Sequence, residues 1–382
     1  EAVVEPMYGV NATDWNNDGY QDIVTSPYCR TGGSLFAGGP NGTFRDATAE
    51  ANYSAQHAKR DGPGLLCQWE ANPADFDNDG DMDLLQVIVH GGYYEGMGRT
   101  VIAVNQGKDK GYKYEWNLDR IRRDAPLTSH LGDMGACWWD IDNDGKLDMA
   151  IGQMSYPTAN LQGQERLYIL RQNDSGYFDD ISKKLGIFYT MKEAHSMEPF
   201  DYDLDGDHDL IFSRQVRDTI EVDTVINGQQ QKVKVEKVYM KIHLLRNNIG
   251  NKNNWIGIKV NPPAGSNKSG IGTRIIVWSN GIRYTKDIQA GLGHFANQQS
   301  FIQLFGLGQY NRVDSVVIRW LMKGFPESRY YNPPINAYLD MDSSGFKVMD
   351  VKTWDPSPEQ INLIAFEASH LDFGKVNVGE NK

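Results

Sequence analysis

The segment DIDNDGKLD at residues 140–148 decides the interpretation of this sequence, because its pattern occurs four times along the chain. The other copies are DWNNDGYQD at 14–22 (loop one), DFDNDGDMD at 75–83 (loop two) and DYDLDGDHD at 201–209 (loop four), with 140–148 as loop three. All fit D-x-[DN]-x-D-G-x-x-D, with acidic or amide side chains at positions 1, 3, 5 and 9 and glycine at position 6. Such a loop places oxygen ligands around a tight turn, as a hard divalent cation requires. The sequence therefore predicts four metal loops, and the expected ion is Ca²⁺.

Carboxylates dominate the predicted ligand sets, and the backbone carbonyl of position 7 is expected to complete each set. Like charges packed this closely raise one another's pKa values or unfold the turn unless a cation neutralises them, so we expect strain in the metal-free loops. Position 7 varies freely, and its side chain is expected to point away from the ion. The predicted metal residues are Asp14, Asn16, Asp18, Tyr20 and Asp22 in loop one; Asp75, Asp77, Asp79, Asp81 and Asp83 in loop two; Asp140, Asp142, Asp144, Lys146 and Asp148 in loop three; and Asp201, Asp203, Asp205, Asp207 and Asp209 in loop four.

Two alternatives for these loops are an EF-hand and an acidic surface turn without metal. An EF-hand requires a bidentate glutamate at position 12. That position holds Thr25, Gln86, Ile151 and Phe212. Short apolar runs follow position 9 instead, and runs of this length predict buried strands rather than helices. Four copies with glycine in register argue against a metal-free turn.

The spacing of the loops predicts the architecture. Their first aspartates are residues 14, 75, 140 and 201, so the repeat lengths are 61, 65 and 61 residues. Repeats of this length with strand signals throughout predict an all-β fold, a β-propeller in which each repeat forms a four-stranded blade. The expected strands are 7–13, 22–26, 34–36 and 42–47 in the first repeat, and 135–139, 149–152, 166–170 and 176–181 in the third. Since four repeats are fewer than a usual ring contains, we expect the C-terminal strands to close it; the alternative is a small propeller beside a separate sandwich.

Further motifs resemble known families. The segments NGTFRDAT at 41–48 and SGYFDDIS at 175–182 follow a loop and a strand, and they resemble FG-GAP/VCBS repeats. The region from Asn254 to about Asp340 resembles the ASPIC/UnbV domain that follows such repeats in the cartilage acidic protein family and its bacterial relatives. The motifs of this second region are NWIGIK at 254–259, SGIGTR at 269–274, QAGLG at 289–293, FGLG at 305–308 and VDSVVIRW at 313–320.

The resemblance implies a propeller of Ca²⁺-binding repeats at 1–250 and an ASPIC/UnbV β-domain at 251–345 that completes or packs on it. Residues 346–382 are expected to hold a linker and the start of an immunoglobulin-like module. Two insertions depart from the family pattern, a connector at 91–99 and a longer segment at 218–239. An Asn-Gly pair between alternating residues in the longer segment predicts a β-hairpin, either a contact element or an edge extension.

Composition narrows the partners and the compartment. A net charge of −12 disfavours nucleic acid and anionic membranes as partners. No apolar run is long enough to span a membrane. Because weak calcium sites stay empty at cytosolic ion levels, we expect a secreted or cell-surface protein. Cys67 and Cys137 precede loops two and three, and free buried thiols are favoured over a bridge between them.

Two classes of function remain. The favoured class is a non-catalytic, calcium-stabilised scaffold for adhesion that binds an extracellular protein or a glycan. The alternative is a polysaccharide-active enzyme, a lyase or hydrolase with an axial pocket. The sequence has no nucleophile elbow, HExxH helix, Walker loop, dinucleotide fingerprint or zinc-ligand spacing. The residual candidates for an axial pocket are His57, His130, His195, Glu70, Glu193 and Glu198. The unequal offsets of the three histidines from the loops argue against a repeated catalytic role, while the three glutamates hold comparable positions before the loops.

Overall fold

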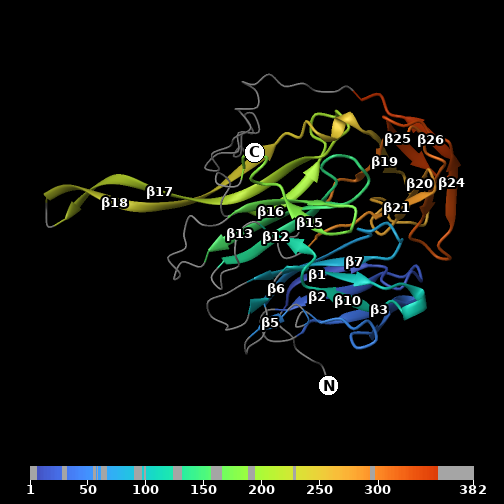
Figure 1. The fold of residues 1–382 in the computed structure, drawn as a ribbon, viewed down its shortest axis with the longest axis horizontal. Coiled ribbons are helices and arrows are strands. Elements are labelled where there is room, and N and C mark those ends of the chain that lie inside the picture. The colour runs from blue at the N-terminus through green and yellow to red at the C-terminus, as the bar shows by residue number, and fades with distance from the viewer. Residues whose placement is uncertain are drawn as a thin grey trace, which may run out of the picture.

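The chain is all-β in the computed structural model. The structure describes residues 7–27, 32–54, 57, 59–61, 67–89, 97–98, 100–123, 131–155, 166–187, 194–226, 229–292 and 297–351. The repeats build four sheets of three to five strands and one separate two-stranded sheet, and the C-terminal region builds two more sheets. Figure 1 shows the C-terminal sheets, coloured orange to red, beside the repeat sheets, coloured blue to lime. None of the helices formed by the described residues has the length and apolar character needed to cross a membrane.

The first repeat forms a sheet whose strands follow one another in sequence order. These strands are β1 (Met7–Thr13), β2 (Asp22–Pro27), β3 (Leu35–Gly39) and β4 (Thr43–Asp46), all antiparallel. Val24 and Leu35 are fully buried, whereas β4 at the outer edge is exposed along its whole length. The four strands predicted for this repeat are confirmed.

The third repeat follows the same plan and also confirms its four predicted strands. They are β12 (Leu131–Trp139), β13 (Asp148–Ser155), β14 (Leu167–Gln172) and β15 (Phe178–Asp180). A fifth strand, β11 (Ile121–Arg122), follows the second sheet in the chain and pairs parallel with β15. This strand ties the second repeat to the third.

The second repeat is more deeply buried than the first. Its sheet has the order β10-β9-β7-β6. The strands are β6 (Cys67–Ala74), β7 (Asp83–Val89), β9 (Val101–Asn105) and β10 (Tyr114–Asn117), with a separate pair of β5 (Lys59–Asp61) and β8 (Met97–Gly98). Every side chain of β7 is buried, because neighbouring sheets cover both of its faces.

The fourth repeat contains the predicted hairpin, which is longer than expected. Its strands are β16 (Ala194–Phe200), β17 (Asp209–Ile226) and β18 (Gln229–Leu245). β17 and β18 pair antiparallel from Leu210↔Leu245 to Ile226↔Gln229 without a register shift. The hairpin confirms the expected pairing, while its Asn-Gly turn at 227–228 lies outside the described residues. Its outer part projects far from the body (Figure 1).

Successive repeat sheets pack side by side through their first strands. β1 contacts β6, β6 and β7 contact β12, and β12 contacts β16. Asn72 Nδ2 donates to the carbonyl of Ala136 at 2.9 Å, which links the second sheet to the third. Phe76 and Trp138 stack across the same boundary, with ring centroids 5.9 Å apart. The expected closure is not shown, because the described sheets do not form a closed ring and the C-terminal strands pair among themselves.

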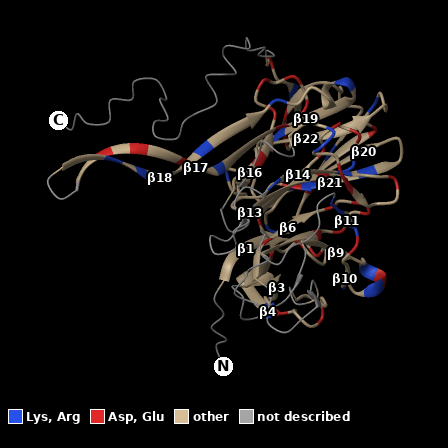
Figure 2. Cartoon of the chain, turned by 60° about the vertical axis from the view of Figure 1, so that its left-hand side comes forward, with Lys and Arg blue, Asp and Glu red and all other residues tan. Residues whose placement is uncertain are grey.

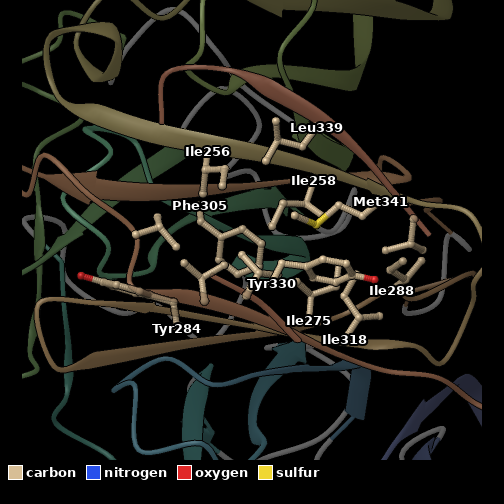
Figure 3. Packing of buried hydrophobic residues seen from close by; sticks show 14 of the residues in the cluster. Ile256, Ile258, Ile275, Tyr284, Ile288, Phe305, Ile318, Tyr330, Leu339 and Met341 are labelled. Atoms are coloured by element: carbon tan, nitrogen blue, oxygen red, sulfur yellow. The ribbon is translucent and has the colours of Figure 1, made fainter. Parts of the chain in front are cut away.

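The C-terminal strands form a sandwich of two four-stranded sheets, ordered β22-β19-β25-β26 and β21-β20-β23-β24. The strands are β19 (Asn254–Val260), β20 (Arg274–Ser279), β21 (Ile282–Asp287), β22 (Ile302–Gly308), β23 (Ser315–Arg319), β24 (Glu327–Tyr331), β25 (Tyr338–Asp342) and β26 (Gly345–Val348). Figure 3 shows Ile256, Phe305 and Leu339 of one sheet facing Ile275 and Ile318 of the other. This core makes the region a domain with its own hydrophobic interior.

The cysteines differ from expectation at one position. Cys137 is a buried free thiol, as predicted. Cys67 is disulfide-bonded, and its partner lies outside the described residues, so the expectation of a free thiol at Cys67 was wrong. Sequence spacing does not reveal which distant segments approach each other, and disulfide formation depends on that approach. The segment 352–382, where the immunoglobulin-like module was expected, also lies outside the described residues.

Candidate metal centres

Three of the four loops bring their carboxylates together. In each, one carboxylate oxygen from positions 1, 3 and 9 lies within 4.8 Å of the other two. The three triads are Asp75, Asp77 and Asp83 in loop two; Asp140, Asp142 and Asp148 in loop three; and Asp201, Asp203 and Asp209 in loop four. Position 5 is not part of any triad. Three acidic groups around one point form an all-oxygen donor set.

The aspartate at position 9 also joins each loop to its sheet. One carboxylate oxygen accepts the backbone N–H of position 2, at 2.7 to 3.3 Å. The other accepts a backbone N–H in or just after the third strand of the sheet, at 2.7 Å in every repeat. The donors are Gly38, Asn105, Gln172 and Asn247. Position 9 is therefore a structural anchor as well as a potential ligand.

Positions 5 and 7 form the turn. The carboxylate of position 5 accepts the backbone N–H of position 7 at 2.8 to 3.2 Å in all four loops, an Asx-type turn. The position 7 side chains contact residues outside their own loops. Tyr20 lies edge-on to Phe325, Lys146 pairs with Asp174 at 2.6 Å, and Asp207 accepts the N–H of Asn251 at 2.9 Å.

Loop one differs from the others. Its position 3 is Asn16, an amide without charge. The Arg274 guanidinium of the sandwich lies 3.8 Å from the Asp14 carboxylate, and it also pairs with Asp287 at 2.7 Å. Arginines also pair with the position 3 aspartates of two other loops, Arg171 with Asp142 and Arg246 with Asp203 at 2.8 Å. Fixed cations therefore offset part of the charge in several loops, and loop one differs mainly in its uncharged position 3.

Burial raises the pKa of the loop carboxylates. It raises the pKa of Asp14 to about 6, of Asp75 to about 7 and of Asp140 to about 8. At position 9, burial raises the pKa of Asp22 to about 7 and of Asp209 to about 8. Neighbouring aspartates add to the shift in each loop. The charged form is therefore disfavoured until a cation arrives.

The donor chemistry fits a hard cation. Asp75 is 1% exposed, and neither of its carboxylate oxygens accepts a hydrogen bond of normal geometry. An uncompensated buried carboxylate is costly, so the site requires a proton or a positive charge. The triads contain oxygen donors alone, which suits Ca²⁺ or Mg²⁺ rather than a thiophilic metal.

A residue that the sequence analysis missed links the loops in series. Asn78 at position 4 of loop two donates to the carbonyl of Gly145 at position 6 of loop three, at 2.9 Å. Asn17 makes the same bond to Gly80 at 3.2 Å, and Asn143 makes it to Gly206 at 2.7 Å. The signal was present in the sequence, because position 4 is asparagine in three loops.

The C-terminal sandwich covers all four loops. At position 6 of each loop, a methyl group in place of the glycine hydrogen would clash with a side chain of the sandwich. The pairs are Gly19 with Phe325, Gly80 with Arg283, Gly145 with Tyr284, and Gly206 with Trp255. These glycines also have φ between +85° and +96°, which other residues rarely adopt. Glycine is thus required twice, for the turn and for the close approach of the sandwich.

Polar contacts complete this joint between the loops and the sandwich. The Tyr338 hydroxyl donates to Asp201 in loop four. The backbone N–H of Gly308 donates to the carbonyl of Asn143 at 2.7 Å. Asn253 donates to the carbonyl of Asp142, also at 2.7 Å. The loops therefore bind the sandwich on one side while anchoring the repeat sheets on the other.

The residual catalytic candidates do not assemble into one site among the described residues. Burial, with a further contribution from the nearby charge of Glu70, raises the pKa of Glu198 to about 8. Glu70 accepts hydrogen bonds from Asn72 at 3.0 Å and from the N–H of Ala136 at 3.2 Å. His57 is exposed and lies against Trp116 of the outermost strand β10, whereas Glu70 is on the innermost strand β6. His195 is on β16, and residues 130 and 193 lie outside the described chain.

The fold and the loops define an all-β repeat protein with acidic loops covered by a β-sandwich domain. The FG-GAP-like repeat model matches residues 14–86 and 140–212, and the model named ASPIC and UnbV matches residues 263–345. The chain thus belongs to the proteins that combine FG-GAP-like repeats with a C-terminal ASPIC/UnbV domain. No curated protein matches the chain.

Removal of metal is expected to destabilise the protein. A calcium site contributes about 2.7 kcal/mol to the free energy of unfolding when the free calcium concentration is about 100 times its dissociation constant. Asp142→Ala should lose a contribution of this size in excess calcium, and calorimetric titration should show one site fewer. Asp109→Ala, on an exposed turn, is the control and should melt as the wild type does. An unchanged melting curve in excess EDTA would contradict the prediction.

Calcium stabilisation is expected to weaken as the pH falls. The loop carboxylates have folded-state pKa values of about 6 to 8, above the ordinary 3.8. The metal-free folded state therefore gains protons and stability as the pH falls through this range, and these protons compete with calcium. Melting temperatures should be measured for the metal-stripped and the calcium-loaded protein across this pH range. The difference between the two should become smaller towards the acid end of the range. A difference in melting temperature that grows with acidity would refute this.

Gly145→Ala should lower the free energy of unfolding by more than the strain of its backbone conformation explains. Both Gly145 and Gly186 have positive φ, so alanine at either position incurs about 1–3 kcal/mol of strain. The new methyl group at 145 would also lie 2.5 Å from Tyr284, whereas nothing lies within 4 Å at 186. Denaturant unfolding should therefore show the larger loss for Gly145→Ala, and an equal loss at the two positions would argue against the joint.

Proposed function

We propose that this chain is an extracellular, calcium-stabilised scaffold that binds a protein or glycan partner and catalyses no reaction. The observation that carries the proposal is the joint between the four loops and the C-terminal sandwich. Side chains of the sandwich lie against position 6 of every loop. Ions held in the loops would fix the repeat sheets and the sandwich to each other. This role is structural, and it does not require the ions to contact a substrate.

The repeat sheets support a β-propeller in which they are successive blades. The first three sheets have at least four strands each and contact the next sheet through their first strands, as blades do. Calcium suits the loops better than magnesium, because Ca²⁺ accepts flexible sets of carboxylate and carbonyl ligands, whereas Mg²⁺ demands near-ideal octahedral geometry.

Secretion is supported by the cysteine chemistry as well as by calcium. Cys67 is disulfide-bonded, and disulfides persist in oxidising compartments such as the extracellular space. Calcium is abundant in the same space, so weak loops of this kind would remain loaded there. Both arguments favour a secreted or cell-surface protein.

An open groove offers a place for the partner. It has a volume of about 820 Å³ and lies between loop two, the third repeat sheet and the turn between β20 and β21. Asp77, Asp79, Arg120, Trp278 and Arg283 line it. An indole face beside charged groups suits a sugar ring with acidic substituents, or a polar peptide. By contrast, the inner cavity that contains Glu198 and Lys286 measures about 70 Å³, well below the roughly 300 Å³ of ligand pockets. The small volume of that cavity argues against a polysaccharide-active enzyme that binds its substrate there.

Binding without turnover is the expected result. An array of uronate-containing and neutral oligosaccharides should retain the calcium-loaded protein, with no new reducing ends or unsaturated products. Trp278→Ala should weaken retention roughly tenfold, because the aromatic face is lost. Tyr331→Ala, which removes an exposed aromatic ring from β24, is the control. Catalytic release of products would overturn the proposal, and equal retention by Trp278→Ala would exclude this groove.

A further inference from the structure

The outer part of the β17–β18 hairpin is a two-stranded ribbon whose edges are unpaired among the residues that the structure describes. β16 pairs with β17 only as far as Arg214, and no described strand pairs with the outer edge of β18. Beyond that point the two strands have no neighbours among the described residues. Isolated two-stranded ribbons are marginally stable in water, and their unpaired N–H and C=O groups template the addition of another strand.

The ribbon also exposes apolar side chains on one face. The direct pairs Ile220↔Val235 and Val222↔Val233 share this face. Ile220, Val222 and Val235 are 37–38% exposed. Charged pairs such as Glu221↔Lys234 occupy the opposite face. A third and fourth strand would extend this apolar stripe and shield part of it from water.

We propose that the occupant of the free β18 edge is β18 of a second copy of this chain, paired antiparallel about a twofold axis at Val235. This register sets Lys234 opposite Glu236 of the partner subunit, and the reverse pair follows by symmetry. Moving the axis to Lys234 or to Glu236 would place two like charges opposite each other, which is destabilising. The charge pattern of the strand is therefore self-complementary in the proposed register.

The size of the body excludes the competing arrangement. In the competing arrangement, β18 of one copy pairs with β17 of the next, so that the ribbons form a parallel stack. The acidic residues of β17 would then lie opposite the lysines of β18, as they do within the hairpin. Such ribbons would be about 10 Å apart. A body of this chain length has a radius of gyration of about 21 Å, so neighbouring bodies would collide. Antiparallel pairing of β18 places the two bodies at opposite ends of a four-stranded sheet. Figure 2 shows the ribbon clear of the body, with charges of both signs along it.

Sedimentation velocity over a concentration series in calcium tests the proposal. The wild type should show a monomer–dimer equilibrium. Lys234→Glu and Glu236→Lys should each weaken it roughly tenfold, because like charges then face each other. An equimolar mixture of these two variants should restore the dimer as a heterodimer, since every facing pair is again of opposite charge.

A matched control separates the interface from the hairpin itself. Glu221→Lys also places a like charge opposite Lys234, but it does so inside the ribbon. Residue 221 lies on β17, away from the proposed β18 edge. It should dimerise as the wild type does. Three results would overturn the proposal: a monomeric wild type at every concentration, a dimer unchanged in both single variants, or a mixture that stays monomeric.

Discussion

Carboxylates buried between two parts of the same chain are the constraint on which the rest of this structure depends. The loops lie between the repeat sheets and the C-terminal sandwich, where the carboxylates at positions 1 and 9 are largely shielded from water. Asp75 is the clearest case, because it is almost fully buried and lacks hydrogen bonds of normal geometry. A positive charge at this boundary resolves the conflict. Arg274, Arg171 and Arg246 supply part of it in loops one, three and four, and a metal ion fits the carboxylate triads of loops two, three and four.

The same aspartates connect several levels of structure. Position 9 holds the third strand of its own sheet, so a disturbance of the loop would reach that strand. The asparagines at position 4 bind the next loop, so the loops form a series rather than four independent sites. Leu204 takes this position in loop four, where the series ends, and it packs against the Trp255 cluster of the sandwich instead. Each loop is thus connected by hydrogen bonds or packing contacts to its neighbours and to the sandwich.

The proposed binding groove borders the acidic loops, since Asp77 and Asp79 of loop two line it. The loops are largely covered, while the groove beside Trp278 and the ribbon formed by β17 and β18 face solvent. Such an arrangement suits a scaffold, because rigid internal joints hold exposed surfaces in fixed positions.

The sequence alone determined the acidic loops, the repeat length, the strands of the first and third repeats and the existence of the hairpin, because these depend on local pattern and periodicity. Tertiary structure decided the rest. Gly145 reads as a turn residue in the sequence, yet Tyr284, more than a hundred residues away, leaves no room for a side chain there. The disulfide at Cys67, the cation beside Asp14 and the separate C-terminal sandwich likewise depend on which distant segments meet. Local periodicity carries no information about such meetings, because they are set by the packing of whole sheets.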